Sequence, residues 1–307
     1  MRADLRAPVA VKSNEVIADR LREAADLLEQ QQANPFRVRA YRDAARTVEG
    51  LNTDVREIAD RGGAGTLALL PRVGPRIARA IDELLRTGRW SQLERLRGTL
   101  DPEKLFRAIP GVGAALSGRI YDTLHVDTLE ALEIAAHDGR LARVPGVGPR
   151  RAAMIRSALG SMLGRPWRPS TSPAAEPPVA ELLDVDREYR AKAVEGRLPR
   201  IAPRRFNPRR EAWLPVLHTE REDRHYTALF SNTARAHQLG RVTDWVVIHY
   251  HTDHDADGQR TVVTETGGPL EGERVVRGRE AECHDHYETQ GSRSAESKEP
   301  FDASATS

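Results

Sequence analysis

Apolar residues in the first half of the chain recur every three or four positions, which is the spacing of one buried helix face. The two clearest stripes are Ile17, Leu21, Ala24 and Leu28, and then Val38, Tyr41, Ala45 and Val48. Asn14 and Asn34 are the expected N-caps of these helices, and Asp127 is the expected cap of a helix over 128–137. Further helices are expected near 54–60, 64–70 and 75–86 and after Asp101-Pro102. No strand-like alternation interrupts residues 14–164, so this half is predicted to be all-α.

The pattern changes after a Pro- and Ser-rich stretch at 165–178, which is predicted to be a linker. One helix is expected at 179–195 and a short one at 233–239. Period-two alternation predicts strands at 213–220, 225–231, 244–252 and 260–266. The fold class is therefore two-domain: an all-α N-terminal half, and a small α+β domain built on an antiparallel sheet over 179–289. Residues 1–13 are expected to be flexible, and residues 290–307 to form a disordered tail.

The composition excludes several classes of protein but does not identify a function. The 307 residues carry 47 Lys+Arg against 45 Asp+Glu, so bulk charge does not point to a nucleic-acid partner. Lysine occurs only at positions 12, 104, 192 and 298, so arginine supplies nearly all the positive charge. The single cysteine, Cys283, excludes an internal disulfide and a multi-cysteine zinc module. No apolar run reaches the roughly 18 residues of a membrane span, and a cytoplasmic protein without a membrane partner is expected.

Three segments of the helical half repeat one pattern of Pro, a glycine turn and an amphipathic helix. They are LLPRVGPRIARAI (69–81), AIPGVGAALSGRI (108–120) and RVPGVGPRRAAMI (143–155). Glycine permits the sharp turn and close approach of another backbone, and the following helix begins with unpaired N–H groups at its positive dipole end. One copy is as often a plain turn, but three matched copies, each followed by arginine, favour a grip on DNA phosphates. The predicted DNA-binding residues here are Gly74, Arg76, Gly111, Gly113, Arg119, Gly146, Gly148, Arg150 and Arg151.

These repeats resemble helix-hairpin-helix motifs, and residues 14 to about 160 resemble the N-terminal region of the bacterial family X DNA polymerases. The resemblance rests on NPFRVRAYRDAARTVEGL (34–51), LPRVGPRIARAIDELLRTGRW (70–90) and the two later glycine turns, in that order and spacing. It implies non-sequence-specific binding of gapped, nicked or branched DNA through backbone phosphates, in a DNA repair context. It also implies a monovalent cation held by hairpin carbonyls; no other cofactor is expected.

The chain departs from that family at its reactive positions. The lysine that forms an imine with an abasic sugar is replaced by Ala80, and the first glycine of the first hairpin is replaced by Arg72. No pair of Asp-x-Asp carboxylates follows a Gly-Ser after residue 165, so a polymerase palm is not expected. The leading interpretation is a DNA-binding protein with no catalytic residues. The alternatives are a reduced family X enzyme with lyase, nuclease or metal-dependent phosphoesterase activity, and a scaffold that binds another repair protein.

The segment HYHTDHDADG (249–258) contains histidines at metal-ligand spacing. It resembles the His-x-His-x-Asp-His pattern of metallo-β-lactamase-like hydrolases, with His249, His251 and His254 as candidate ligands that His284 and His286 could complete. The motif leads into a strand instead of a helix, however, and the chain is short for such a hydrolase. A polar hairpin tip is therefore the favoured interpretation.

An arginine-rich run, GRLPRIAPRRFNPRREAW (196–213), contains six arginines up to Arg210 and no acid before Glu211. Arginines interleaved with Phe206 and Trp213 are typical of surfaces that follow a phosphate backbone and stack on unpaired bases. The alternative is a solvated loop whose aromatic side chains fill the core. The predicted contacts are Arg204, Arg205, Arg209 and Arg210.

Overall fold

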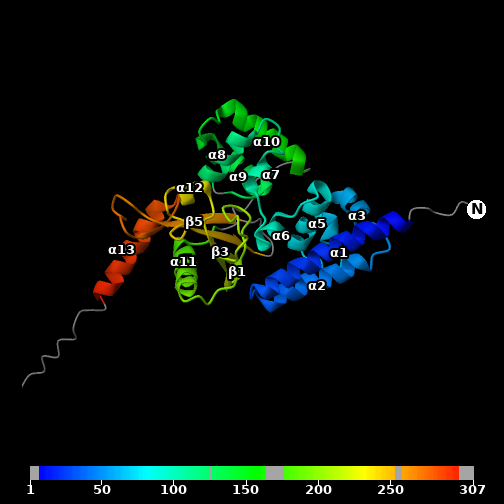
Figure 1. The fold of residues 1–307 in the computed structure, drawn as a ribbon, viewed down its shortest axis with the longest axis horizontal. Helices are drawn as coiled ribbons and strands as arrows, with labels where there is room; N and C mark the ends of the chain where they lie inside the picture. Colours follow the sequence, from blue (N-terminus) through cyan, green and yellow to red (C-terminus); the bar gives the residue numbers. More distant parts are fainter. Residues whose placement is uncertain (1–6, 125, 164–175, 253–257, 297–307) are drawn as a thin grey trace, which may run out of the picture.

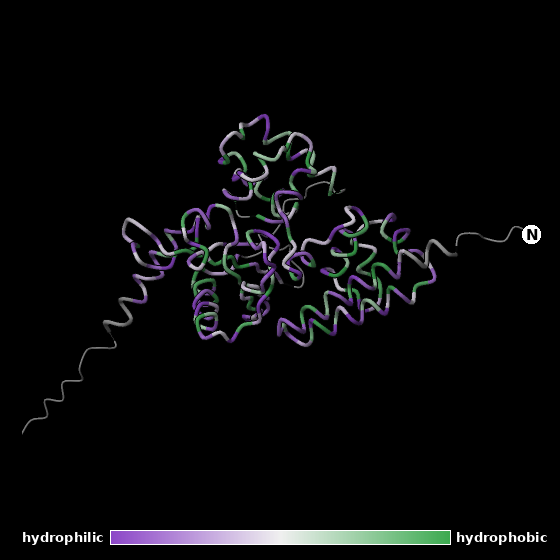
Figure 2. The backbone as a smooth tube through the Cα atoms, in the orientation of Figure 1, coloured by the Kyte–Doolittle hydropathy of each residue, from purple (hydrophilic) through white to green (hydrophobic). Residues whose placement is uncertain are grey.

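The computed structural model of the chain describes residues 7–124, 126–163, 176–252 and 258–296 (Figure 1). Its first helical unit contains α1 (Ala7–Gln30), α2 (Pro35–Glu49), α3 (Val55–Gly62), α4 (Ala64–Leu67), α5 (Pro75–Thr87) and α6 (Ser91–Leu96). A short connection makes α1 and α2 an antiparallel pair, which buries both predicted stripes. Figure 2 shows hydrophobic and hydrophilic positions alternating along this pair, as an amphipathic helix requires.

Two of the three expected N-caps are wrong. The Asn34 side chain does cap α2, accepting from the Phe36 N–H at 2.8 Å. Asn14, however, lies inside α1, where its buried amide donates to the Thr53 carbonyl (3.0 Å) and accepts from the N–H of Val55, the first residue of α3 (2.8 Å). Helix α9 is capped by Thr128, whose hydroxyl accepts from the Ala131 N–H, and Asp127 is occupied by an ion pair instead.

The second helical unit has its own core, so the predicted domain over 14–164 contains two cores. It comprises α7 (Pro102–Phe106), α8 (Ala114–Leu124), α9 (Leu129–His137), the 3-10 helix η1 (Arg140–Arg143) and α10 (Pro149–Leu163). Phe106, Ile120 and Leu132 are fully enclosed in this core. The first core ends at Leu96 and the second begins at Leu105, which places the boundary between the two units in the intervening connection.

The remaining described residues form the predicted α+β domain. A six-stranded antiparallel sheet has the order β1-β2-β3-β4-β5-β6, so each strand pairs with the next in sequence. The strands are β1 (Arg200–Ile201), β2 (Leu214–Arg221), β3 (Arg224–Phe230), β4 (Val246–His251), β5 (Gly258–Thr264) and β6 (Arg274–Val276), and the helices are α11 (Val179–Val194), α12 (Ala234–Gln238) and α13 (Glu280–Glu296). The four predicted strands and both predicted helices are present; β1, β6 and α13 were not expected.

The two faces of the sheet meet different neighbours. Because successive side chains alternate along a strand, Val246, Ile248 and Tyr250 of β4 join the core that includes α11. His249 and His251 point to the opposite face, where both are buried in a small pocket that residues of the first helical unit also line. This sheet face is therefore covered by the helical half of the chain.

Three units meet at Asp127. Arg95 of α6 donates to both carboxylate oxygens of Asp127 (2.8 and 3.0 Å), which lies just before α9. The His249 Nε2 of β4 lies 3.7 Å from the same carboxylate. The contact therefore links the first helical unit, the second helical unit and the sheet.

A second contact between the sheet and the first helical unit fixes a histidine tautomer. The Gln31 amide nitrogen donates to the Leu96 carbonyl (2.7 Å), so its oxygen faces His218 Nε2 (2.9 Å). An amide oxygen only accepts, so Nε2 carries the proton, and Nδ1 accepts from the Thr227 hydroxyl (3.0 Å). The neutral His218 side chain thus joins Thr227 of the sheet to Gln31 of the first helical unit.

The ends of the domains differ in part from expectation. Helix α1 begins at Ala7, within the segment predicted to be flexible, and α13 continues to Glu296, within the predicted tail. The predicted linker lies mainly outside the described residues, as does the expected turn at Asp257. Among the described residues, no helix is both long and apolar enough to cross a membrane.

Candidate nucleic-acid interface

Each predicted hairpin forms a turn that leads into a helix. Gly74, Gly113 and Gly148 directly precede α5, α8 and α10. The Gly113 carbonyl accepts the N–H groups of Leu116 and Ser117, so the N–H groups before Leu116 lie outside the helical hydrogen-bond ladder. These N–H groups are able to donate hydrogen bonds to a bound anion.

The first position of each turn has a left-handed backbone conformation. Gly111 and Gly146 have φ of +80° and +84°, and Arg72 of the first hairpin has φ of +60°. The replacement of glycine by Arg72 therefore leaves the shape of the turn intact. The left-handed backbone is strained there, because arginine has a Cβ atom and glycine does not.

The second glycine of each turn faces open space. A Cβ atom built on Gly74, Gly113 or Gly148 would meet nothing within 4 Å. None of the three has a positive φ, so folding does not require glycine there. The absence of a side chain instead leaves room for another molecule to reach the backbone.

The second and third hairpins pack on each other reciprocally. A Cβ on Gly111 would lie 2.6 Å from Met154 Cε, and one on Gly146 would lie 3.2 Å from Arg119 Nη2. Arg119 and Met154 occupy the same repeat position, six residues after the second glycine of their own hairpins. The contact is therefore that of an internal two-fold repeat, and it keeps both turns in a fixed relation.

The arginines of the hairpins have different environments. Arg119, Arg150 and Arg151 are exposed, and Arg151 donates to the Gly146 carbonyl (2.8 Å). Arg76 of the first hairpin is partly buried and donates to Gln92 Oε1 (3.1 Å). The second unit therefore presents its cations to solvent, whereas the first turns Arg76 toward protein.

The arginine-rich run divides in the same way. Arg204, Arg209 and Arg210 are exposed. Arg205 forms a 2.6 Å ion pair with Glu103 of α7, and its guanidinium lies 5.2 Å from the centre of the Tyr121 ring on α8. In this arrangement the Arg205 guanidinium joins the sheet domain to the second helical unit.

The family lysine position lies at a cleft. Ala80 lines a cleft of ≈ 900 Å³ between the two helical units, together with Arg76, Arg79 and residues of α10. No lysine is among the lining residues, so this described site contains no amine to form an imine.

The described candidate metal ligands lie in two separate places. His249 and His251 are buried on the sheet face that meets the helical half, whereas α13, with His284 and His286, packs against α11 and β6. His254 lies outside the described residues. Burial, reinforced by nearby arginines, holds the pKa of His251 well below its usual range, so this imidazole is neutral.

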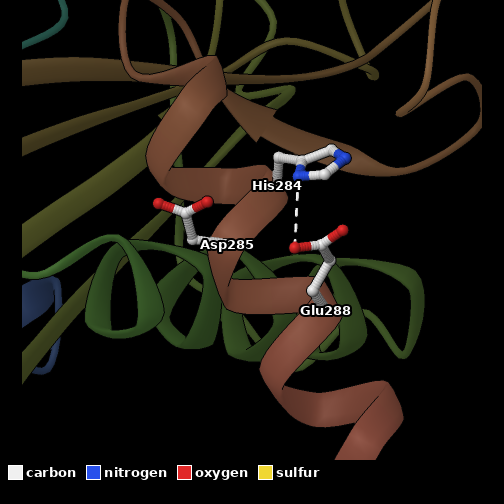
Figure 3. A group of neighbouring side chains, drawn as sticks. All are labelled: His284, Asp285 and Glu288. Carbon is white, nitrogen blue, oxygen red and sulfur yellow. Dashed lines mark ion pairs between the residues drawn. The ribbon is translucent and has the colours of Figure 1, made fainter.

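Among the described residues, one group of three potential metal ligands lies close together, on α13 (Figure 3). His284 Nδ1 lies 3.7 Å from Glu288 one turn later, and Asp285 is the adjacent residue. The two carboxylates are exposed, and the His284 side chain is itself only partly buried. These features describe a solvated helix face, so no metal site is assigned to it.

Comparison with known proteins agrees with the two helical cores. Residues 12–90 match the family described as a helix-hairpin-helix domain, and residues 103–161 match the SAM-like helix-hairpin-helix tandem. The helical half is a pair of helix-hairpin-helix domains. The boundary that these domains leave, between residues 90 and 103, agrees with the division of the cores.

Two curated relatives match part of the chain. The DNA polymerase/3′-5′ exonuclease PolX of Bacillus subtilis is 29% identical over 137 residues, which is 44% of this chain and 23% of the relative. The Holliday junction branch migration complex subunit RuvA of Acidiphilium cryptum is 31% identical over 109 residues, which is 32% of this chain and 53% of the relative. The chain thus spans at most about half of either relative. The helix-hairpin-helix domains resemble the N-terminal region of a family X polymerase, as the sequence predicted.

Proposed function

We propose that this protein binds DNA without sequence specificity, through backbone phosphates, using its second and third hairpins. One observation carries the proposal: two reciprocally packed turns present open glycines, helix N–H groups and exposed arginines. Backbone N–H groups and guanidinium groups recognise phosphate oxygens whatever the base, so such contacts position DNA without reading sequence.

The preferred DNA in this proposal is gapped, nicked or branched, and the setting is DNA repair. Two turns in a fixed relation contact two separated phosphates, which makes the path of the backbone a determinant of affinity. The relatives support this class of partner, since one is named as a DNA polymerase and exonuclease and the other as a Holliday junction subunit. A monovalent cation at the hairpin carbonyls is part of the proposal; at Gly146 it would share the carbonyl with Arg151.

The experiment replaces Gly113 and Gly148 with valine and measures affinity for intact, nicked, gapped and branched duplexes. A side chain at these positions occupies the space that a phosphate needs, so each site is expected to lose about 1–3 kcal/mol of binding, the scale of a charged hydrogen-bond set. The loss should be alike on every sequence. Because a Cβ meets no neighbour at either position, the circular dichroism spectrum should be unchanged.

Gly160→Ala, inside α10 and also without a neighbour, is the matched control and should bind as the parent does. Unchanged affinity in the folded double variant would refute the assignment to these hairpins. Equal affinity of the parent for all four DNA forms would refute the structural preference alone.

A further inference from the structure

The loop between β1 and β2 holds an aromatic side chain at the protein surface. Phe206 is 47% exposed, and its backbone is left-handed, with φ of +52°. Such a conformation is an outlier for a bulky residue and persists only where the surroundings enforce it. The inner side of the ring contacts His237, with ring centres 4.3 Å apart.

Hydrogen bonds hold this loop on both sides of Phe206. The Arg205 carbonyl accepts from the Asn232 amide (3.0 Å), and the oxygen of the same amide bonds His237 Nε2 (2.6 Å). On the other side, the Asn207 side chain bonds the Glu211 backbone twice, at 2.8 and 3.1 Å. The aromatic ring is therefore fixed in place before any ligand arrives, which lowers the entropic cost of stacking on it.

The loop is also attached to the helical half of the chain. The Arg204 N–H donates to the carbonyl of Gly98, in the connection between the two helical units (2.8 Å), and Arg205 pairs with Glu103 of the second unit. Phe206 consequently keeps a defined position relative to the unit that contains the second and third hairpins.

Arginines flank the exposed ring along the chain, and the Arg205 guanidinium lies 5.1 Å from the centre of the ring. Arg204, Arg209 and Arg210 are exposed, and Arg210 has a left-handed backbone, with φ of +53°. The Arg209 guanidinium lies 3.8 Å from the exposed carboxylate of Glu211, and an exposed ion pair of this kind adds little. Exposed arginines beside an aromatic ring are the combination that binds single strands, because the cations follow the backbone and every base has a face to stack.

We propose that Phe206 stacks on an unpaired base of a DNA strand that leaves the duplex held by the hairpins. Arg204, Arg209 and Arg210 bind the phosphates of that strand. The ligand class is DNA with a junction between duplex and single strand. This inference rests on the proposed DNA binding and names the feature of the DNA that the sheet domain recognises.

The test uses the full chain and three labelled DNAs: an intact duplex, the same duplex with a single-stranded tail, and the tail alone. Phe206→Ala should bind the tailed duplex roughly 5- to 150-fold more weakly, the range seen when one base–aromatic stack is removed. Its affinity for the intact duplex should match that of the parent. Phe206→Leu, which keeps an apolar side chain without a ring, should behave like alanine, and Phe206→Tyr should behave like the parent.

A 2-aminopurine base at the junction gives a readout specific to stacking. Its fluorescence should be quenched by the parent and by Phe206→Tyr, and not by Phe206→Ala or Phe206→Leu. Tailed-duplex affinity and quenching within twofold of the parent in both ringless variants would overturn the inference. So would an equal loss on intact duplex with an unchanged circular dichroism spectrum. If the parent binds the tailed duplex no more tightly than the intact duplex, this inference is refuted and the proposed DNA binding stands. If the parent binds none of the three DNAs, the proposed function itself is refuted.

Discussion

Arg72 stands at the turn position where the second and third hairpins have Gly111 and Gly146, and it keeps the same left-handed backbone. A non-glycine residue in the left-handed conformation costs about 1–2 kcal/mol, which glycine avoids. Glycine in turn costs roughly 0.5–1 kcal/mol, because it loses more conformational entropy on folding. The Arg72–Asp43 ion pair is exposed on the arginine side and contributes little. Arg72→Gly is therefore expected to raise the free energy of unfolding by up to about 1 kcal/mol, as measured by urea denaturation.

Gly111→Ala is the matched opposite change. An alanine there would keep a φ of +80°, and its methyl group would press on Met154. The free energy of unfolding should therefore fall by about 1–2 kcal/mol. A decrease for Arg72→Gly as well would mean that the arginine side chain, and not the turn, determines stability at this hairpin.

Ala80 stands at the position of the family's imine-forming lysine, so the protein is not expected to form an imine with an abasic sugar there. Without an amine in the adjoining cleft, borohydride should trap no covalent adduct between the protein and an abasic 5′-sugar phosphate. Lys104 is the nearest lysine along the chain after this helix, at the exposed surface of α7. A trapped adduct that Lys104→Ala abolishes would identify a relocated nucleophile and favour the enzymatic alternative.

At the scale of elements, the sequence was informative wherever periodicity was long. The stripes of α1 and α2 and the alternation of β2 to β5 predicted those elements because one face of each is buried in a core. Strands β1 and β6 have two and three residues, too few to show a period, and α13 contains few apolar residues after Cys283. The wrong caps have a related cause, since Asn14 and Asp127 are used by partners distant in sequence.

The contact between β2 and the first helical unit predicts acid sensitivity. Burial, with help from the nearby Arg37, lowers the pKa of His218 to about 3, against an ordinary value of 6.5. The unfolded chain thus binds a proton that the folded chain excludes, so this contribution to stability is complete above pH 6.5 and is lost as pH falls toward 3. Between pH 7 and pH 5 the loss is about 2 kcal/mol for one such group.

The comparison that isolates this histidine uses His218→Gln, whose amide can still bond Gln31 and Thr227 but does not titrate. Unfolding followed by urea denaturation at pH 7, 6 and 5 should show a shallower fall in stability for the variant than for the parent. Parallel pH profiles would show that other groups, His251 among them, cause the acid sensitivity.

At the scale of the whole molecule, the hairpin motifs were predictable, and the way the units meet was not. The glycine turns are local in sequence, and the structure places all three at helix starts. The contacts of Arg95 with Asp127, of Arg205 with Glu103 and of Gln31 with His218 join residues from 32 to 187 positions apart. No periodicity or motif encodes such pairs. The sequence therefore predicted the same DNA-binding role for Arg204, Arg205, Arg209 and Arg210, whereas the structure separates Arg205, which pairs with Glu103, from its three exposed neighbours.

That separation sharpens the prediction for the salt dependence of DNA binding. Each arginine–phosphate contact contributes a slope of about −0.9 on duplex DNA, or about −0.7 on a single strand, to log affinity against log salt, because a counterion is released. Changing Arg204, Arg209 and Arg210 together to alanine should flatten the slope by about two to three units and leave the circular dichroism spectrum unchanged. Arg205→Ala should have a different effect, because its loss leaves Glu103 without this partner and removes one of the contacts that hold the sheet domain on the second helical unit. We expect it to change the small-angle scattering profile with little change in slope. If the triple variant keeps the parent slope while it remains folded, the run is a solvated loop and the hairpins supply all the phosphate contacts.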